Sequence, residues 1–330
     1  MRVMIPLSVL DLAPIAEGSD AGIALNNARD IAQAAERLGY HRFWMAEHHS
    51  MPGIASAATA VALVHVASGT SAIRIGAGGI MLPNHSPLQV AEQFGTLAAL
   101  FPGRIDLGLG RAPGTDQAAA YAMRRNLSAD VGQFPRDVVE LQGYFRPAEP
   151  GQRVIAVPGE GLEVPLWILG SSTYGAELAA ELGLPYAFAS HFAPQQMMEA
   201  IALYRSRFKP SDQLAAPYVM LGFNVFAADS DEEGELLATS LMQAFVALRS
   251  GNPGKLRPPV EGYADTLPLE YRAMLRSVLS SSAIGAPATV RAATEAFVNR
   301  TGADELMITS QIFDHAARLR SFEFLAQALA

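Results

Sequence analysis

Histidine is the side chain in this sequence best suited to proton transfer near neutral pH. Four of the seven histidines closely follow short apolar runs: His48, His49, His85 and His191. Any one of them would more often be structural, but the recurrence after apolar runs indicates a common place in the fold. The chain has no cysteine, which excludes disulfides, Cys-based zinc sites and a thiol nucleophile. The pattern favours acid–base chemistry by imidazole.

A histidine metal site is not supported by the spacing. Barrel zinc sites often use His-x-His, because alternate residues of a strand face the same side. His48 and His49 are adjacent, so in a strand they point in opposite directions. No other histidine pair has strand or helix ligand spacing, and we predict that no metal takes part.

A second candidate for chemistry is the segment 104–116, which reads R-I-D-L-G-L-G-R-A-P-G-T-D. Its apolar residues alternate as in a strand until Gly110. Arg111 then enters an Ala-Pro-Gly turn. Its guanidinium offers a fork of donors suited to a phosphate or to a planar, oxygen-rich ring. The alternative is a solvated charge at the rim of a strand.

A Gly-Ser-Ser-Thr turn at 170–173 stands between a predicted strand and a predicted helix. Backbone N–H groups and hydroxyls at a helix start can hold an anion. An ordinary N-cap would use the same residues. The sequence has neither a GxxxxGK[ST] motif nor a good GxGxxG after its first strand. An NTPase P-loop and a Rossmann nicotinamide site are therefore unsupported.

Alternating strands and helices are predicted to position these side chains. Strands are expected at 3–10, 42–46, 73–82, 105–110, 165–170, 186–189, 218–227 and 305–309. Helices are expected at 23–38, 56–68, 87–100, 117–144, 172–182, 194–208, 231–249, 288–299 and 316–329. This order predicts an α/β fold with a parallel sheet. A closed (β/α)₈ TIM barrel with insertions after strands 4 and 7 is the leading choice, and a doubly wound open sheet is the alternative.

Residues 1–330 are predicted to form one domain, because no linker or repeat interrupts the pattern. The segment 250–285 is too long for an ordinary connection. Its first part, 250–268, has four prolines and three glycines. We predict that this segment is a lid or a mobile loop.

Composition narrows the class of protein. Half of the residues are hydrophobic, the net charge is −8 and the mean hydropathy is +0.17. A negative chain with a pI of about 5.4 lacks the basic face of a nucleic-acid binder. The longest apolar runs, such as 57–67, are shorter than the roughly 18 residues of a spanning helix. We expect a cytoplasmic protein with neither a nucleic-acid nor a membrane partner.

Five motifs in this order resemble the bacterial luciferase-like flavin-dependent monooxygenases. They are W-M-A-E-H-H (44–49), G-G-I-M-L-P-N-H-S-P (78–87), F-P-G-R-I-D-L-G-L-G-R-A-P-G-T-D (101–116), L-G-S-S-T-Y-G-A (169–176) and D-E-L-M-I-T-S (304–310). The resemblance runs from the first strand to the last helix and is strongest to the single-chain, alkanal-monooxygenase-like branch. Taken together, the set of five motifs is specific.

The resemblance implies a TIM barrel that binds FMN at its C-terminal face. Reduced FMN from a separate flavin reductase is the co-substrate and, with O₂, oxidises an aldehyde or another small organic substrate. Two alternatives remain: a deazaflavin-dependent hydride-transfer enzyme on the same barrel, and a flavin-binding protein without turnover.

The resemblance also implies roles for individual residues. His48, and not His49, matches the active-site histidine, an acid or base close to the flavin. Gly78 and Gly79 match the site of a non-proline cis peptide beside the isoalloxazine ring. Arg111 matches the arginine that reaches the flavin phosphate. Ser171 and Ser172 match the helix-start residues that cradle that phosphate.

Two glycines depart from the light-emitting members of the family. Gly110 stands where those members have a cysteine near the flavin, so luciferase activity itself is not expected. Gly175 replaces a phosphate-contacting threonine, and Thr173 or Tyr174 is a candidate substitute.

A homodimer is implied as well. The helix predicted at 56–68 offers a physical reason, because small side chains would let another helix approach closely. These side chains are Ala57, Ala58, Ala60, Ala62 and Ala67. The alternative is that this helix packs only on its own barrel.

Overall fold

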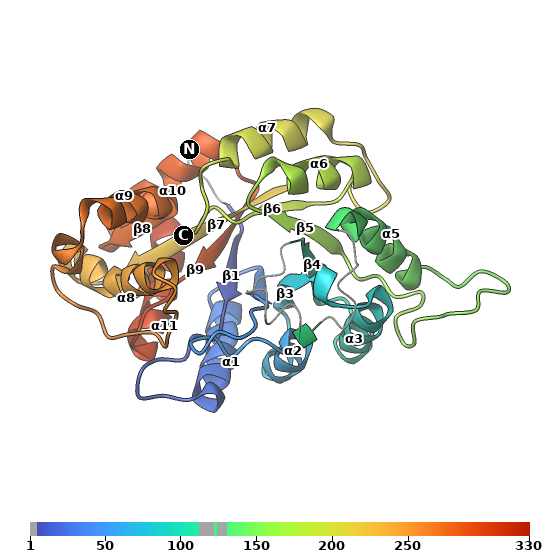
Figure 1. The fold of residues 1–330 in the computed structure, drawn as a ribbon, viewed down its shortest axis with the longest axis horizontal. Helices are drawn as coiled ribbons and strands as arrows, with labels where there is room; N and C mark the ends of the chain where they lie inside the picture. Colours follow the sequence, from blue (N-terminus) through green and yellow to red (C-terminus); the bar gives the residue numbers. More distant parts are fainter. Residues whose placement is uncertain (1–4, 112–121, 124–130) are drawn as a thin grey trace.

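A computed structural model describes residues 5–111, 122–123 and 131–330 of the chain. Nine parallel strands of the described residues form one sheet (Figure 1). The strands are β1 (Leu7–Asp11), β2 (Arg42–Met45), β3 (Arg74–Met81), β4 (Ile105–Gly110), β5 (Leu166–Gly170), β6 (Tyr186–Phe188), β7 (Val219–Ala227), β8 (Ser282–Gly285) and β9 (Glu305–Thr309). The order is β6-β5-β4-β3-β2-β1-β9-β7-β8, and β6 also pairs with β7. This last pairing closes the barrel and rules out the open sheet.

Helices surround the barrel, as Figure 1 shows. They are α1 (Ala21–Arg37), α2 (Thr59–Ala67), α3 (Pro87–Leu100), α5 (Phe134–Phe145), α6 (Thr173–Leu182), α7 (Met197–Arg207), α8 (Asp231–Arg249), α9 (Leu269–Val278), α10 (Pro287–Thr301) and α11 (His315–Leu329). None of the helices in the described part of the chain is long and apolar enough to cross a membrane.

Local signals fix several helix ends. The side chains of Asp20, Ser230 and Asp314 cap α1, α8 and α11 by accepting a hydrogen bond from a backbone N–H of the first turn. Gly183 and Gly302 end α6 and α10 with positive φ angles of 65° and 61°. Glycine adopts this left-handed conformation without the steric cost that other residues have.

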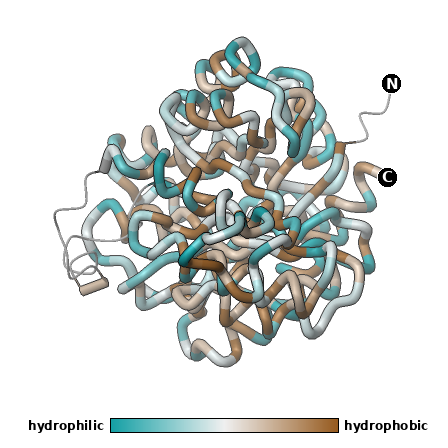
Figure 2. The backbone as a smooth tube through the Cα atoms, turned by 90° about the vertical axis from the view of Figure 1, so that its right-hand side faces the viewer, coloured by the Kyte–Doolittle hydropathy of each residue, from teal (hydrophilic) through white to brown (hydrophobic). Residues whose placement is uncertain are grey.

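The core has two layers because successive strand residues face opposite sides. One side of each strand packs under the helices, and the other side fills the barrel. Strands buried on both sides have nearly continuous apolar runs, as in β7, which is buried at every position. Figure 2 shows hydrophobic stretches mixed with hydrophilic ones along the described backbone. The interior cluster consists of Leu10, Trp44, Ala46, Trp167, Ala187, Met220 and Met307.

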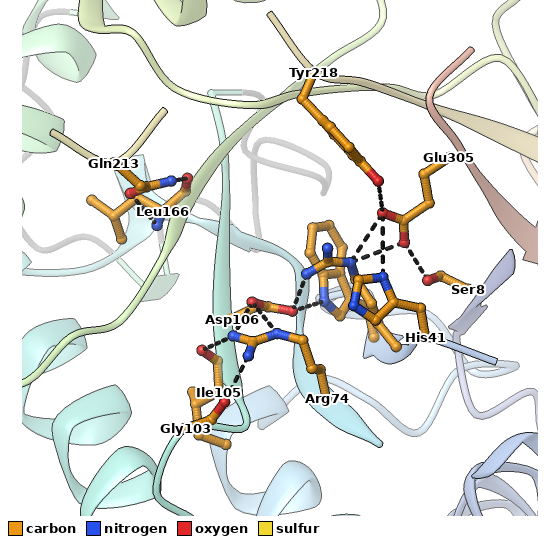
Figure 3. A network of polar contacts seen from close by, with 12 residues as sticks. Ser8, His41, Arg74, Gly103, Ile105, Asp106, Leu166, Gln213, Tyr218 and Glu305 are labelled. Atoms are coloured by element: carbon orange, nitrogen blue, oxygen red, sulfur yellow. Dashed lines mark hydrogen bonds and ion pairs between the residues drawn. The ribbon is translucent and has the colours of Figure 1, made fainter. Parts of the chain in front are cut away.

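Charged side chains close the N-terminal end of the barrel (Figure 3). Arg42 Nε donates to Glu305 Oε1 over 2.9 Å, and its Nη1 donates to Asp106 Oδ2 over 2.8 Å. Arg74 donates to the other oxygen of Asp106 over 2.6 Å. Burial alone would lower the pKa of Arg42, but the two adjacent carboxylates raise it. These four residues lie at or near the starts of their strands, and their contacts connect the strand starts inside the barrel.

Ser8 belongs to this network, which corrects its expected position. The longer strand predicted at 3–10 would place Ser8 near the C-terminal end of the barrel. In the structure β1 runs from Leu7 to Asp11, so Ser8 lies near its start and donates to Glu305. Tyr218 donates to the same carboxylate over 2.9 Å.

The insertions follow β4 and β7, as predicted. The second insertion contains α9 and β8, which the prediction of a lid or mobile loop at 250–285 did not include. β8 pairs with residues 224–227 of β7, beyond the residues that pair with β6. The helix predicted at 117–144 falls partly outside the described residues, and α5 forms its last part.

Candidate functional site

The C-terminal ends of the strands bring the predicted site residues to one end of the barrel, where active sites of this fold lie. β2 leads into Glu47, His48 and His49, and β4 into Arg111. The segment between β5 and α6 contains Ser171 and Ser172, and β6 leads toward His191. Gly78 and Gly79 lie within the last half of β3.

Gly78 and Gly79 form a bare stretch of backbone on β3. The peptide bond between them is cis, as the resemblance implies. A Cβ on Gly79 would lie 2.6 Å from the carbonyl oxygen of Gly108 on β4, and one on Gly78 would lie 2.8 Å from Leu10 Cδ1. A side chain is therefore excluded at Gly79, where backbone is in the way, and one at Gly78 would have to displace the Leu10 side chain. Gly110 is open, since a Cβ there would meet only the oxygen of Ile80, at 3.8 Å.

The start of α6 combines with Arg111 to form a candidate anion site. The guanidinium carbon of Arg111 lies 4.0 Å from the centre of the Tyr174 ring, in a cation–π contact. Ser172 is the N-cap of α6 in an extended conformation, and in the structure its side chain makes no capping hydrogen bond. The first-turn N–H groups are thus without a side-chain cap, beside a cation, which suits a phosphate.

Gly175 lies in the same first turn, where its lack of a side chain has a steric reason. A Cβ would be 3.3 Å from both the Leu169 carbonyl oxygen and a Tyr186 ring carbon. Tyr186 is held there by its hydroxyl, which donates to the Ser172 carbonyl over 3.0 Å. A threonine hydroxyl at 175 is therefore disfavoured by packing, and Tyr174 is the neighbour that contacts Arg111.

His49 and His85 converge on the buried carboxylate of Glu47. Their Nε2 atoms lie 2.5 Å and 2.8 Å from Glu47 Oε1, while Oε2 accepts the N–H of Met81 over 3.0 Å. Burial alone would raise the pKa of Glu47, but these hydrogen bonds hold it below its usual value. The cluster ties the end of β2 to the end of β3.

This cluster also brings together three side chains of types that can hold a metal, although no further histidine pair has strand or helix ligand spacing. The candidate ligand atoms of Glu47, His49 and His85 lie within 4.8 Å of one another. The spacing rule missed the cluster because it joins two strand ends that are 38 positions apart. Both rings approach one carboxylate oxygen at hydrogen-bond distance, so metal-free chemistry stays our prediction.

His48 and His191 differ from those two histidines. Each has a buried Nδ1 atom without a hydrogen-bond partner among the described residues. Burial lowers the pKa of His48 below its ordinary value of 6.5, an effect that the charge of Glu47 partly opposes. Burial, followed by the nearby His48, lowers the pKa of His191 to about 4. Both imidazoles are therefore neutral at pH 7.

These residues fit a flavin on three observations of the structure. An uncapped helix start and Arg111 suit the phosphate. Gly110, where a Cβ would meet only the oxygen of Ile80, leaves open space at the end of β4. Two imidazoles at this end of the barrel, those of His48 and His191, are neutral at pH 7. Sequence reasoning gave no role to His191, although the glycine at 222 inside a strand was a signal of close approach.

Comparisons with known proteins agree with this fit. The chain matches the family described as "Luciferase-like monooxygenase" over residues 5–305. A protein of Escherichia coli (strain K12) named "Luciferase-like monooxygenase" is 53% identical over 319 residues, 97% of this chain and 95% of that protein. The N-acetyl-S-alkylcysteine monooxygenase of Bacillus subtilis (strain 168) is 36% identical over 277 residues, 81% of this chain and 82% of that protein.

Solved structures share the fold over the whole chain. Apo-MsnO8 has a TM-score of 0.87 at 34% identity and covers 98% of both chains. Two more distant structures show the fold alone. One is the oxygenating constituent of 3,6-diketocamphane monooxygenase of Pseudomonas putida with FMN (TM-score 0.70, 18% identity, 98% of this chain and 97% of that one). The other is an F420-dependent secondary alcohol dehydrogenase with an F420-acetone adduct (TM-score 0.70, 15% identity, 99% of both). The chain therefore belongs to the luciferase-like monooxygenase family.

Proposed function

We propose that the protein is an FMN-dependent two-component monooxygenase that uses reduced FMN and O₂ to oxidise an aldehyde or another small organic substrate. The observation that carries this proposal is the uncapped α6 start beside Arg111, together with two imidazoles at the same end of the barrel whose Nδ1 atoms are buried and have no hydrogen-bond partner among the described residues. Monooxygenase relatives and a neighbour solved with FMN support it.

In this proposal, separate residues of the chain bind the FMN phosphate and transfer the proton. Arg111, Ser171, Ser172 and the first-turn amides of α6 hold the phosphate. Bound reduced FMN supplies the electrons that activate O₂. His48, neutral because it is buried, accepts a proton from the reacting group and returns it. The apolar barrel interior beneath keeps water from the reacting atoms.

A reductase-coupled assay tests this function. The protein is mixed with FMN, a flavin reductase and a series of unbranched aldehydes, with and without O₂. Aldehyde consumption that needs both FMN and O₂ supports the proposal. Consumption without O₂ that needs the deazaflavin F420 would favour hydride transfer instead. FMN binding with no consumption of any aldehyde would favour a flavin-binding protein without turnover.

Replacing Arg111 by alanine is expected to weaken FMN binding by about 1.5–3 kcal/mol, the usual value of a hydrogen bond to a charged group. Riboflavin, which has no phosphate, should bind the wild type and the variant about equally. Fluorescence titration with both flavins measures the two affinities. An unchanged FMN affinity in the variant would show that Arg111 does not contact the phosphate.

The segment 250–285 is proposed to close over the bound flavin. Leu256 exchanges backbone hydrogen bonds with Ile15 and Glu17, which follow β1, and the Ser282 hydroxyl accepts a hydrogen bond from the Asn224 side chain of β7. The segment is thus attached to the residues that follow β1 and to β7. We expect hydrogen exchange there to slow when flavin and substrate bind. Mass spectrometry of exchange with and without ligands measures this, and equal rates in both states would count against a lid.

We propose that two copies of the chain form a homodimer through the outer face of α2. The physical reason differs from the one expected from the sequence. Ala62 and Ala67 are buried against the chain's own barrel, so they do not offer a close approach. Val61 is 72% exposed and Val64 is 37% exposed on the outer face. We expect light scattering to give twice the chain mass of 35.1 kDa, and Val61→Asp to shift it toward the monomer. A wild-type mass of 35.1 kDa would refute the dimer.

A further inference from the structure

The four histidines at the C-terminal end of the barrel fall into two pairs. His49 and His85 are held by the carboxylate of Glu47. His48 and His191 each keep a buried Nδ1 without a partner in the described part of the chain. They also lie close enough for the charge of His48 to lower the pKa of His191. The proposed function gives His48 a task and leaves His191 without one.

The structure places the His191 ring by several independent contacts. The Ser190 hydroxyl donates to the Gly222 carbonyl over 2.6 Å, and Asn224 Nδ2 donates to the His191 carbonyl over 2.8 Å. The Phe192 ring meets the imidazole edge-on, with centroids 4.9 Å apart. β7 is therefore hydrogen-bonded both to the side chain of Ser190 and to the backbone of His191.

Gly222 makes room for this ring inside β7. A Cβ built on Gly222 would overlap with Nδ1 of His191. β7 is otherwise a fully buried strand of mostly larger residues. The bare backbone at this position lets the imidazole lie directly against the strand, at the end of the barrel where the flavin is proposed to bind.

The environment of His191 selects the chemistry of its ligand. Because burial keeps the imidazole neutral, it offers one N–H donor and one acceptor and no charge. A neutral pair of imidazoles would not offset the cost of burying a carboxylate or an ammonium group. An uncharged oxygen function, such as the carbonyl of an aldehyde, suits it without that cost.

We propose that His191 contacts the substrate directly, hydrogen-bonding the uncharged oxygen of the reacting group on the side opposite His48. This inference rests on the proposed function and adds a substrate-positioning residue to it. The carbonyl oxygen thereby accepts a hydrogen bond from His191, and His48 keeps its separate role as the proton acceptor.

Kinetics of the FMN-supplied protein with octanal test this role. His191→Phe keeps a ring but removes the hydrogen bond, and His191→Gln keeps a hydrogen-bonding group. We expect His191→Phe to raise the KM for octanal about tenfold and to divert reduced FMN into hydrogen peroxide, with partial recovery in His191→Gln. FMN affinity should stay unchanged in both. His315→Gln, at the start of α11, is the control and should behave like the wild type.

Gly222→Ala tests the placement separately, because it displaces the ring and leaves His191 in the chain. The KM of this variant for octanal should rise as in His191→Phe. Its melting temperature, compared with that of the wild type, is the control for folding. Equal KM values in all variants would overturn the inference while leaving the proposed function intact.

If octanal is not oxidised, binding can still be tested by the nuclear magnetic resonance signals of the histidine rings. In the complex with oxidised FMN, octanal should shift the ring signals of His191 and not those of His315. No octanal-dependent shift at His191 would overturn the inference. Failure of the proposed function would appear differently, as no oxidation of any aldehyde in the coupled assay.

Discussion

Replacing His48 by alanine is expected to lower the rate of substrate oxidation by about 10²–10⁴-fold, the usual contribution of general acid–base catalysis. The wild-type imidazole follows β2 at the C-terminal end of the barrel, and burial keeps it neutral, so it can accept a proton from a reacting group. FMN affinity should stay within a few-fold, because the proposed phosphate contacts come from β4 and α6. Reduced FMN would still be consumed by O₂, releasing hydrogen peroxide.

The ratio of product formed to reduced FMN consumed measures this effect. His49→Ala is the matched control, because its ring is bonded to Glu47 and its loss should act mainly on stability. An unchanged ratio and rate in His48→Ala, or a larger loss in His49→Ala, would overturn the assignment.

The pH dependence follows from the direction of the His48 pKa. Because burial lowers this pKa below 6.5, the neutral, proton-accepting form persists through neutral pH. The rate should therefore fall only on the acid side, at a pH below 6.5. This acid limb should disappear in His48→Ala.

Replacing Glu305 by alanine is expected to lower the free energy of unfolding by about 3–5 kcal/mol, the cost of removing one partner from a buried ion pair. The carboxylate is fully buried and bonded to Arg42, Tyr218 and Ser8. Its removal leaves the Arg42 charge with less compensation and leaves two hydroxyls unpaired in the barrel. Urea unfolding followed by circular dichroism measures the loss.

Glu181→Ala provides the comparison for this prediction. Glu181 lies 2.6 Å from Lys209 Nζ, but both side chains are more than half exposed. Such a surface pair contributes about 0–1 kcal/mol. If Glu305→Ala cost no more than Glu181→Ala, the network would not be what stabilises the N-terminal end of the barrel.

The sequence was sufficient for the barrel because apolar runs and helix stops recur in a regular order. Gly183, for example, was predicted to end a helix and does so with a positive φ. Among the α-helices and strands of the described residues, β8 and α9 were missed. β8 is four residues long, and both elements follow a polar segment rich in proline and glycine. The partner of β8 on β7 is about 58 positions away, which no local pattern reveals.

The candidate site was predictable where one local segment defines it. Arg111 and the start of α6 each have a local signature, and so does the Gly78–Gly79 pair. The Glu47 cluster and the pairing of His48 with His191 depend on distances between strand ends, which the barrel sets and local spacing does not. His49 bonds to Glu47, whereas the buried Nδ1 of His48 has no partner among the described residues, and only packing determines that difference.

Oxygen-18 labelling tests the central claim most directly. The wild-type protein is supplied with reduced FMN, oxygen-18 gas and the aldehyde that is oxidised fastest in the coupled assay. The mass of the product is then measured by mass spectrometry. A two-component monooxygenase places one atom from O₂ in each product molecule and releases the other as water. A product labelled in this way is the result that we predict, and a product whose new oxygen comes from water alone would contradict the account.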